Sequence, residues 1–115
     1  MKSFILACLI LLPMTSFAKS LQCEAGKYKI ELTESGSNQI EFKFYDGNGK
    51  LAIKSKISSV EESGNTTIFA HHPTNFTMEI ENLQSTSKTL KGIFDMNDPD
   101  AGQKNSRMEM FCIRK

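Results

Sequence analysis

The sequence lacks the features by which several classes of protein are recognised. Its 14 basic and 13 acidic residues leave a formal net charge of only +1, and no cluster of Lys and Arg supplies the positive patch that binds nucleic acid or an anionic membrane. No apolar run reaches the roughly 20 residues of a membrane-spanning helix. No segment keeps helical spacing over the length of an ordinary helix. These absences argue against a nucleic-acid-binding protein and against a helical fold.

Catalytic and cofactor motifs are also missing. None of the serines stands in a Gly-x-Ser-x-Gly elbow. The adjacent carboxylates of Glu61 and Glu62 lie in a serine- and glycine-rich segment, where they are expected to be solvated. With only two histidines and three cysteines in the chain, a site of three or four metal ligands of these types is not expected. We therefore predict no catalytic residue, no metal and no cofactor.

The N-terminus has the organisation of a secretory signal peptide. Lys2 supplies a positive charge, residues 4–12 form a continuous apolar run, and residues 16–18 provide small side chains around a cleavage point. We predict a signal peptide over residues 1–18 and one exported domain over residues 19–115. The mature protein is expected to be periplasmic or secreted, with no membrane insertion after leader cleavage.

The three cysteines separate into one leader residue and one pair. Cys8 leaves with the leader, whereas Cys23 and Cys112 remain in a compartment that permits oxidation. We predict a disulfide between them, with Cα atoms roughly 4.4 to 6.8 Å apart, that joins the first and last strands. Lipidation at Cys8 is the alternative, because residues 5–8 loosely match a lipoprotein cleavage box.

The mature chain alternates apolar and polar residues with a period of two, which is typical of strands with one buried face. The fold class is therefore all-β: a small antiparallel meander of about seven or eight strands, arranged as a closed barrel or a two-sheet sandwich. Segments 34–38, 59–65 and 84–87 are predicted to interrupt the strands. The predicted strands are 27–33, 39–44, 51–57, 66–70, 76–80, 90–94 and 108–112, with 21–25 as an eighth if it is separate.

The strongest local signal is the turn Asp46-Gly47-Asn48-Gly49. Glycine and asparagine supply the positive φ angles of tight hairpins. We expect both glycines at positive φ, with Phe44 and Leu51 facing the core across the turn.

Two groups of polar residues could bind a metal. The adjacent imidazoles of His71 and His72 could act as ligands or carry protons, although a solvated loop is favoured because the chain has no other histidine. The cluster of Asp95, Asp98 and Asp100 offers oxygen ligands, but it lacks the glycine and the closing glutamate of a calcium loop. Turn formation accounts for these acidic residues better.

Methionines form a third candidate group. Met108 and Met110, followed by Cys112, resemble a soft-ligand cluster for copper(I). All three fall on the inward parity of the last strand, where methionine is an adaptable core residue. Core packing is therefore the favoured role.

Topology predicts which loops lie together. In an uninterrupted meander, successive connections alternate between the two ends of the sheet, so the connections near 46–49, 71–74 and 97–106 should share one end. This set includes the longest loop, and long loops are more often functional than short ones. The candidate binding residues are therefore His71, His72, Asp98, Asp100, Gln103 and Lys104.

A leader, a β domain of this size and a cysteine near each end resemble the layout of the bacterial periplasmic inhibitors of C-type lysozyme, which are small barrels. The resemblance is one of layout and assigns no functional residue, because that family's inhibitory loop motif is not found here. We expect an exported, non-enzymatic binding protein, inhibitor-like in layout, for an extracytoplasmic protein, glycan or small apolar ligand. The alternatives are a periplasmic metal-binding or metallochaperone barrel and an enzyme whose site the sequence does not reveal.

Overall fold

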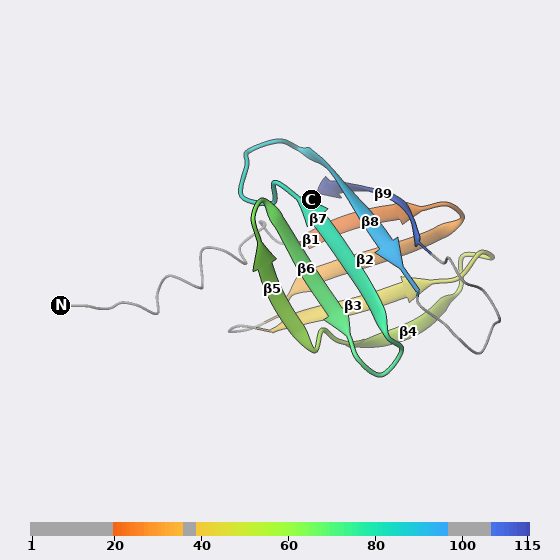
Figure 1. Ribbon diagram of the computed structural model, residues 1–115. Helices are drawn as coiled ribbons and strands as arrows, with labels where there is room; N and C mark the ends of the chain where they lie inside the picture. The colour runs from red at the N-terminus through yellow and green to blue at the C-terminus, as the bar shows by residue number, and fades with distance from the viewer. Residues whose placement is uncertain (1–19, 36–38, 97–106) are drawn as a thin grey trace.

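The computed structural model describes residues 20–35, 39–96 and 107–115. These residues contain no helix and form nine strands (Figure 1). The predicted leader over residues 1–18, including Cys8, lies outside the described residues. The strands are β1 (Ser20–Ala25), β2 (Tyr28–Glu34), β3 (Ile40–Tyr45), β4 (Leu51–Lys56), β5 (Ser59–Ser63), β6 (Thr66–His71), β7 (Phe76–Glu81), β8 (Thr89–Asp95) and β9 (Arg107–Arg114).

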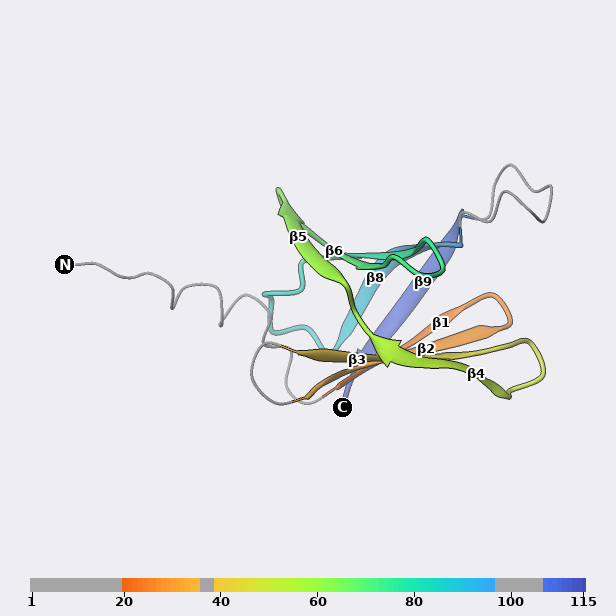
Figure 2. The same ribbon diagram turned by 90° about the horizontal axis from the view of Figure 1, so that it is seen from below.

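All nine strands belong to one antiparallel sheet in the order β4-β3-β2-β1-β9-β8-β7-β6-β5. Consecutive strands are neighbours, except that β4 and β5 form the two edges, while the first and last strands pair in the middle. The sheet curves into a half-barrel, and in Figure 2 the half that contains β1–β4 lies opposite β5 and β6. The predicted all-β antiparallel meander is confirmed.

The two edge strands are joined by a link of two residues. Ile57 N–H donates to the carbonyl oxygen of Ile40 at 2.9 Å, and Ser58 N–H donates to that of Ala70 at 2.8 Å. The main chain therefore hydrogen-bonds to β3 up to Ile57 and to β6 from Ser58 onward. β4, which pairs with β3, continues through this short link into β5, which pairs with β6.

The prediction that residues 59–65 interrupt the strands is wrong for most of that segment. Residues 59–63 form β5, whose register with β6 runs from Ser59 opposite Ala70 to Ser63 opposite Thr66. This edge strand is mostly exposed and has no alternating apolar pattern, so its sequence carries no strand signal. Its pairing partner induces the extended conformation, and only the turn at 64–65 remains as a break.

The hairpin near Asp46 differs from expectation in its register. Phe44 is buried as predicted, but Leu51 is 48% exposed, so the prediction that it faces the core is wrong. A register shift between Phe44 and Tyr45 places Ile53 opposite Phe44 and Leu51 opposite Tyr45. Such a bulge reverses which face a side chain occupies, and Ile53 packs against the core instead.

The turn itself is held by main-chain contacts. Gly49 N–H donates to the carbonyl oxygen of Asp46 at 2.9 Å. Gly49 has a φ of 82°, as predicted, whereas Gly47 is not among the glycines with positive φ. One left-handed residue is therefore enough to form this turn.

The concave side of the sheet is filled by alternate residues of most strands. Phe42, Phe69 and Phe94 are completely buried, and Met78 and Met110 are equally inaccessible. Burial of Met110, together with the packing of half-buried Met108 against the core, confirms the core role predicted for these two methionines. Further aromatic rings extend the cluster, with Phe76 and Phe94 centroids 5.4 Å apart in an edge-to-face arrangement, a geometry that aromatic pairs favour.

The predicted disulfide is present. The sulfur atoms of Cys23 and Cys112 are 2.05 Å apart, and both residues are buried. Their Cα atoms are 3.9 Å apart, so the predicted range of Cα distances is wrong. The two cysteines are directly opposed on neighbouring antiparallel strands, a pairing that brings Cα atoms closer together than most disulfides do. The bond therefore joins the two halves of the sheet at its middle, between β1 and β9.

Candidate functional site

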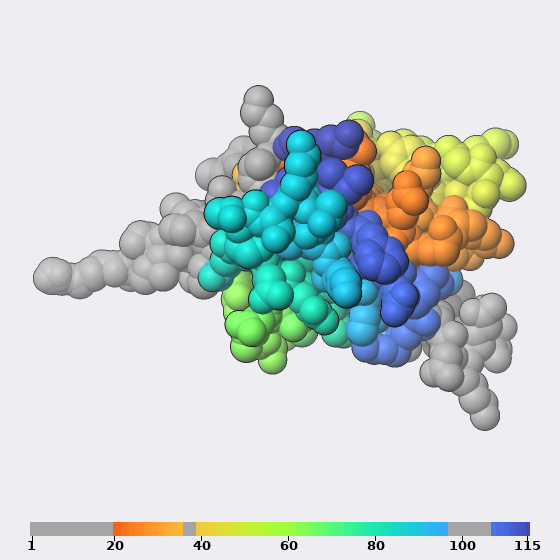
Figure 3. Space-filling view, turned by 90° about the horizontal axis from the view of Figure 1, so that it is seen from above, coloured from red at the N-terminus to blue at the C-terminus, as the bar shows by residue number. Residues whose placement is uncertain are grey.

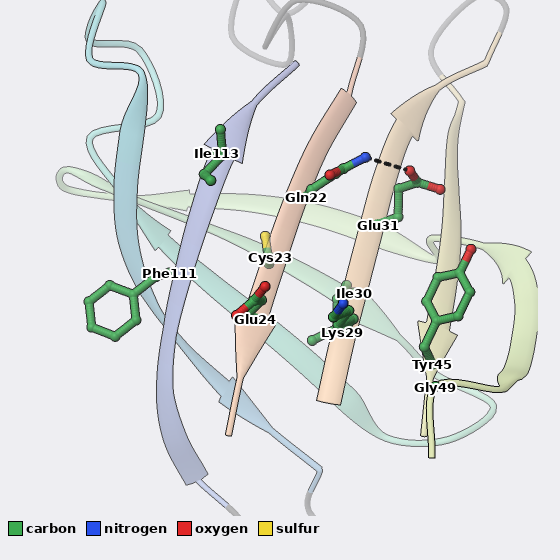
Figure 4. Close-up of a pocket in the computed structure, with 10 residues that line it drawn as sticks. All are labelled: Gln22, Cys23, Glu24, Lys29, Ile30, Glu31, Tyr45, Gly49, Phe111 and Ile113. Atoms are coloured by element: carbon green, nitrogen blue, oxygen red, sulfur yellow. Dashed lines mark hydrogen bonds between the residues drawn. The ribbon is translucent and has the colours of Figure 1, made fainter. Parts of the chain in front are cut away.

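A shallow trough of about 500 Å³ lies on the convex, outer face of β9, β1, β2 and β3 (Figure 4). Its side chains are those that point outward from these strands. The residues between them, such as Cys23 and Ile30, point into the core. The trough thus joins residues near both ends of the chain. The outward residues are Gln22, Glu24, Lys29, Glu31, Tyr45, Phe111 and Ile113.

The floor of the trough is polar, and its charges are partly balanced. Gln22 Nε2 donates a hydrogen bond to Glu31 Oε2 at 3.3 Å, drawn as the dashed line in Figure 4. The other oxygen of Glu31 lies 3.7 Å from Lys43 Nζ. Glu24 and Lys29 are register partners on β1 and β2. The floor can therefore donate and accept hydrogen bonds without a strong field of one sign.

One rim of the trough is apolar. Phe111 is 53% exposed and Ile113 is 43% exposed, and they are successive outward residues of β9. Figure 3 shows this blue strand at the molecular surface beside the orange strands β1 and β2. Exposed apolar side chains that adjoin polar groups are typical of contact surfaces. Tyr45 lies on the opposite side of the trough, on β3 (Figure 4).

Sequence reasoning missed this surface, although a signal for it was present. Residues 110–113 are apolar on both faces of one strand, because Met110 and Cys112 point inward while Phe111 and Ile113 point outward. A strand of an antiparallel sheet with one solvated face normally alternates. The departure from alternation in β9 marks the outer face as unusual.

The predicted loop end is only partly described. The antiparallel order places the β3–β4 and β6–β7 turns at one end of the sheet, as the meander predicted. His72 is exposed there, but His71 faces the interior and is only 2% exposed, so it cannot contact a partner in this conformation. Asp98, Asp100, Gln103 and Lys104 lie outside the described residues.

The two histidines do not share a ligand position. The ring of His71 lies against Phe42, with centroids 4.9 Å apart, and its Nδ1 is 2.8 Å from Thr74 Oγ1. His72 Nε2 is instead 3.5 Å from Ser59 Oγ. Burial, and then the charge of His72, lower the pKa of His71 below 6.5.

The other predicted metal ligands either make structural contacts or lie outside the described residues. Asp95 Oδ2 lies 3.4 Å from Arg107 Nη1, an ion pair that accounts for this carboxylate. Met110 is buried in the core, and Cys112 is in the disulfide. Within the described ranges, no group of three or more His, Cys, Asp or Glu residues could hold a metal ion.

Among residues 20–35, 39–96 and 107–115 there is also no helix with the length and apolar character to cross a membrane. No protein-family model, curated protein or solved structure matches this chain.

Proposed function

We propose that this chain is an exported binding protein that acts without catalysis, and that the outer trough is its binding surface. The observation that carries the proposal is the exposed pair Phe111 and Ile113 beside a polar floor. Covering these two half-exposed side chains would contribute on the order of 1 kcal/mol each to binding. The polar floor would supply orientation through hydrogen bonds, the combination that specific binding surfaces use.

Export is supported by two independent features. The N-terminal residues have signal-peptide organisation, and the disulfide between Cys23 and Cys112 requires an oxidising compartment to persist. A periplasmic or secreted location satisfies both. In that location the partner is an extracytoplasmic protein or a glycan.

A protein or glycan partner fits the surface better than a small apolar ligand. Such a ligand needs an enclosed apolar cavity, whereas the concave side of this sheet is filled by buried rings such as Phe42, Phe69 and Phe94. The trough is open and half polar. The geometry therefore supports binding of a partner whose own surface is broad and carries both apolar and polar groups.

Site-specific photo-cross-linking tests the proposal in the cell that exports the protein. A photoreactive side chain replaces Phe111 in one variant and Glu61 in a control, because Glu61 is an exposed residue of the edge strand β5 and does not line the trough. We expect a discrete adduct from position 111 that is absent from position 61. Failure to obtain an adduct at 111, or equal adducts at both positions, would contradict the trough as binding surface.

The absence of catalysis has its own test. The partner identified by cross-linking is incubated with the purified protein and recovered, and its intact mass is measured before and after. We expect no change in mass and saturable binding that Phe111→Ser weakens at least several-fold, as expected when about 1 kcal/mol or more is lost. A chemically altered partner would contradict the non-enzymatic assignment.

A further inference from the structure

His71 is an unusual residue for the interior of this domain. Of the polar residues that the structure describes, only Thr67 and His71 are buried. The imidazole lies at the last position of β6, where its ring packs on Phe42 of β3 and its register partner on β7 is Phe76. A titratable ring is thus packed against an aromatic ring in the interior.

Thr74 Oγ1 makes three polar contacts around this imidazole. It accepts from Phe76 N–H at 3.3 Å, and it lies 3.3 Å from the His71 carbonyl oxygen and 2.8 Å from His71 Nδ1. The hydroxyl hydrogen can be donated to either of the last two atoms, so the ring donates the Nδ1 contact only in the Nδ1–H tautomer. That neutral tautomer is favoured because the alternative would place an N–H donor without an acceptor at the buried Nε2.

This tautomer leaves Nε2 as a bare lone pair in the interior. Nε2 is buried and has no hydrogen-bond partner among the described atoms. Protonation would place an N–H donor and a positive charge there without an acceptor, which is costly in an apolar environment. The folded conformation thus accommodates only the neutral ring.

Few other charges act on His71 in its surroundings. Phe42 on β3 and Phe76 on β7 are uncharged, and so are Ser58 in the link before β5 and Ser59 at the first position of β5. Burial lowers the pKa of His71 most, and the charge of His72 lowers it further. Among the described residues, no carboxylate acts on this pKa in the opposite direction.

His71 also holds a structurally important turn. The β6–β7 turn contains Asn75 at a φ of 64°, a left-handed conformation that is unfavourable for most residues. His72 N–H donates to Ser58 Oγ at 3.0 Å, so the turn contacts the two-residue link between the edge strands. Removing the His71 ring from the interior would release the turn, and the link would lose this contact.

We propose that His71 and Thr74 form an acid-sensitive latch, which holds the β6–β7 turn over the interior at neutral pH and releases it in mildly acidic surroundings. Release gives solvent access to the rings of Phe42 and Phe76 at this end of the half-barrel. An exported domain meets the pH of its surroundings directly, so this opening would expose a buried aromatic surface in response to acid. The latch does not depend on the outer trough.

The sign of the effect follows from proton linkage. Because the folded-state pKa of His71 is lowered from 6.5, the opened state binds a proton more readily than the closed state. The closed state is favoured fully above the ordinary pKa, and it loses stability as pH falls below it. Between the two pKa values the opened population rises about tenfold per pH unit.

Amide hydrogen exchange, corrected for intrinsic rates, tests the latch at about pH 7.5 and about pH 5, which bracket histidine titration. We expect exchange over residues 57–59 and 72–76 to increase on acidification, by up to about tenfold for each pH unit between the two pKa values, while exchange in β1, β2 and β9 changes little. A uniform increase over all strands would overturn the proposal, because it would indicate global destabilisation instead of a local opening.

Variants separate His71 from its neighbour. His71→Phe keeps a ring of similar size without a titratable group, so the acid response of the turn should disappear. His72→Gln, which changes the exposed neighbour, should keep most of it. A His71→Phe variant with the wild-type acid response, or loss of the response in His72→Gln alone, would overturn the latch.

A measurement on the unmodified protein covers the case in which His71→Phe does not fold. Imidazole nitrogen shifts report tautomer and protonation directly, and we expect the His71 ring to be a neutral Nδ1–H tautomer at neutral pH and to titrate below 6.5. His72 serves as the internal comparison. An Nε2–H tautomer, or titration of His71 at or above the ordinary value, would overturn the proposal.

Discussion

Cys23 on β1 and Cys112 on β9 are directly opposed across the middle of the sheet, with their Cα atoms 3.9 Å apart. They are 89 residues apart in the sequence, so their bond closes a loop that contains most of the chain, including β2 to β8. Cross-links that close long loops restrict the unfolded chain most. The chain ends are thereby held together even when the strands between them separate.

We predict that replacing Cys23 and Cys112 together by alanine lowers the free energy of unfolding by about 4 kcal/mol, the loop-closure estimate for a loop of this length. Urea denaturation monitored by circular dichroism measures it. Wild-type protein reduced under the same conditions is the control and should show a similar loss. Two free thiols in protein taken from the exported fraction would contradict the bond itself.

Gly92 occupies the closest approach between β8 and β7. A Cβ atom at this position would collide with the carbonyl oxygen of Glu79 and lie 3.2 Å from the Cα of Ile80. We predict that Gly92→Ala destabilises the domain by about 1 to 3 kcal/mol, as overpacking does, because main-chain atoms cannot move aside cheaply. Thermal denaturation is the measurement.

Gly47→Ala is the matched control for Gly92→Ala. The three atoms nearest to a Cβ at Gly47 would all belong to the flexible side chain of Lys27, which can move. We expect a change within about 0.5 kcal/mol, as for ordinary surface substitutions. Equal losses for the two variants would show that the close approach at Gly92 is not what requires glycine.

Arg114 organises the connection between β7 and β8. Its Nη2 donates to the carbonyl oxygens of Leu83 and Ser85 at 2.6 Å each, and its Nε donates to that of Ser87 at 2.7 Å. We predict that Arg114→Ala costs about 1.5 to 3 kcal/mol, the range for hydrogen bonds to a charged group. Exchange of amides 83–88 should rise.

Arg114→Lys should recover little of this loss, because an ammonium group cannot reproduce the planar array of guanidinium donors. Lys115→Ala, at the next and exposed position, is the control and should leave both stability and amide exchange unchanged. Full recovery by lysine would show that charge alone holds the connection.

Asp46 stabilises the β3–β4 turn through its carboxylate. Asp46 Oδ1 accepts from Lys50 N–H at 3.0 Å and from Asn48 N–H at 2.8 Å, and these bonds, chiefly the first, lower the pKa of Asp46 below 3.8. A lowered folded-state pKa means that the stabilisation is present above 3.8 and is lost as pH falls through the folded-state value.

We therefore predict that Asp46→Asn melts below the wild type at neutral pH, and that the two melting curves converge as the pH falls through the lowered pKa. Asparagine keeps the acceptor oxygen but not the charge, so the difference isolates ionisation. A difference in melting temperature that persists unchanged in acid would contradict this account.

Much of the strand pattern could be predicted because a half-buried strand records its own orientation locally. Alternation over residues 27–33 and 39–44 identified β2 and β3 and the inward faces that include Ile30 and Phe42, since neighbouring side chains of a strand must point to opposite faces. Pairing of Cys23 with Cys112 was likewise predictable from the sequence, because the third cysteine, Cys8, falls in the predicted leader and leaves an even pair.

Tertiary structure alone decided the features that depend on a partner strand. β5 is extended because it pairs with β6, and Leu51 is exposed because a bulge shifts its register against β3. His71 is buried because β6 directs it onto Phe42. The trough exists because β9 lies beside β1, which brings Phe111 next to Glu24 from the other end of the chain. Such pairings join residues distant in sequence, so no local pattern encodes them.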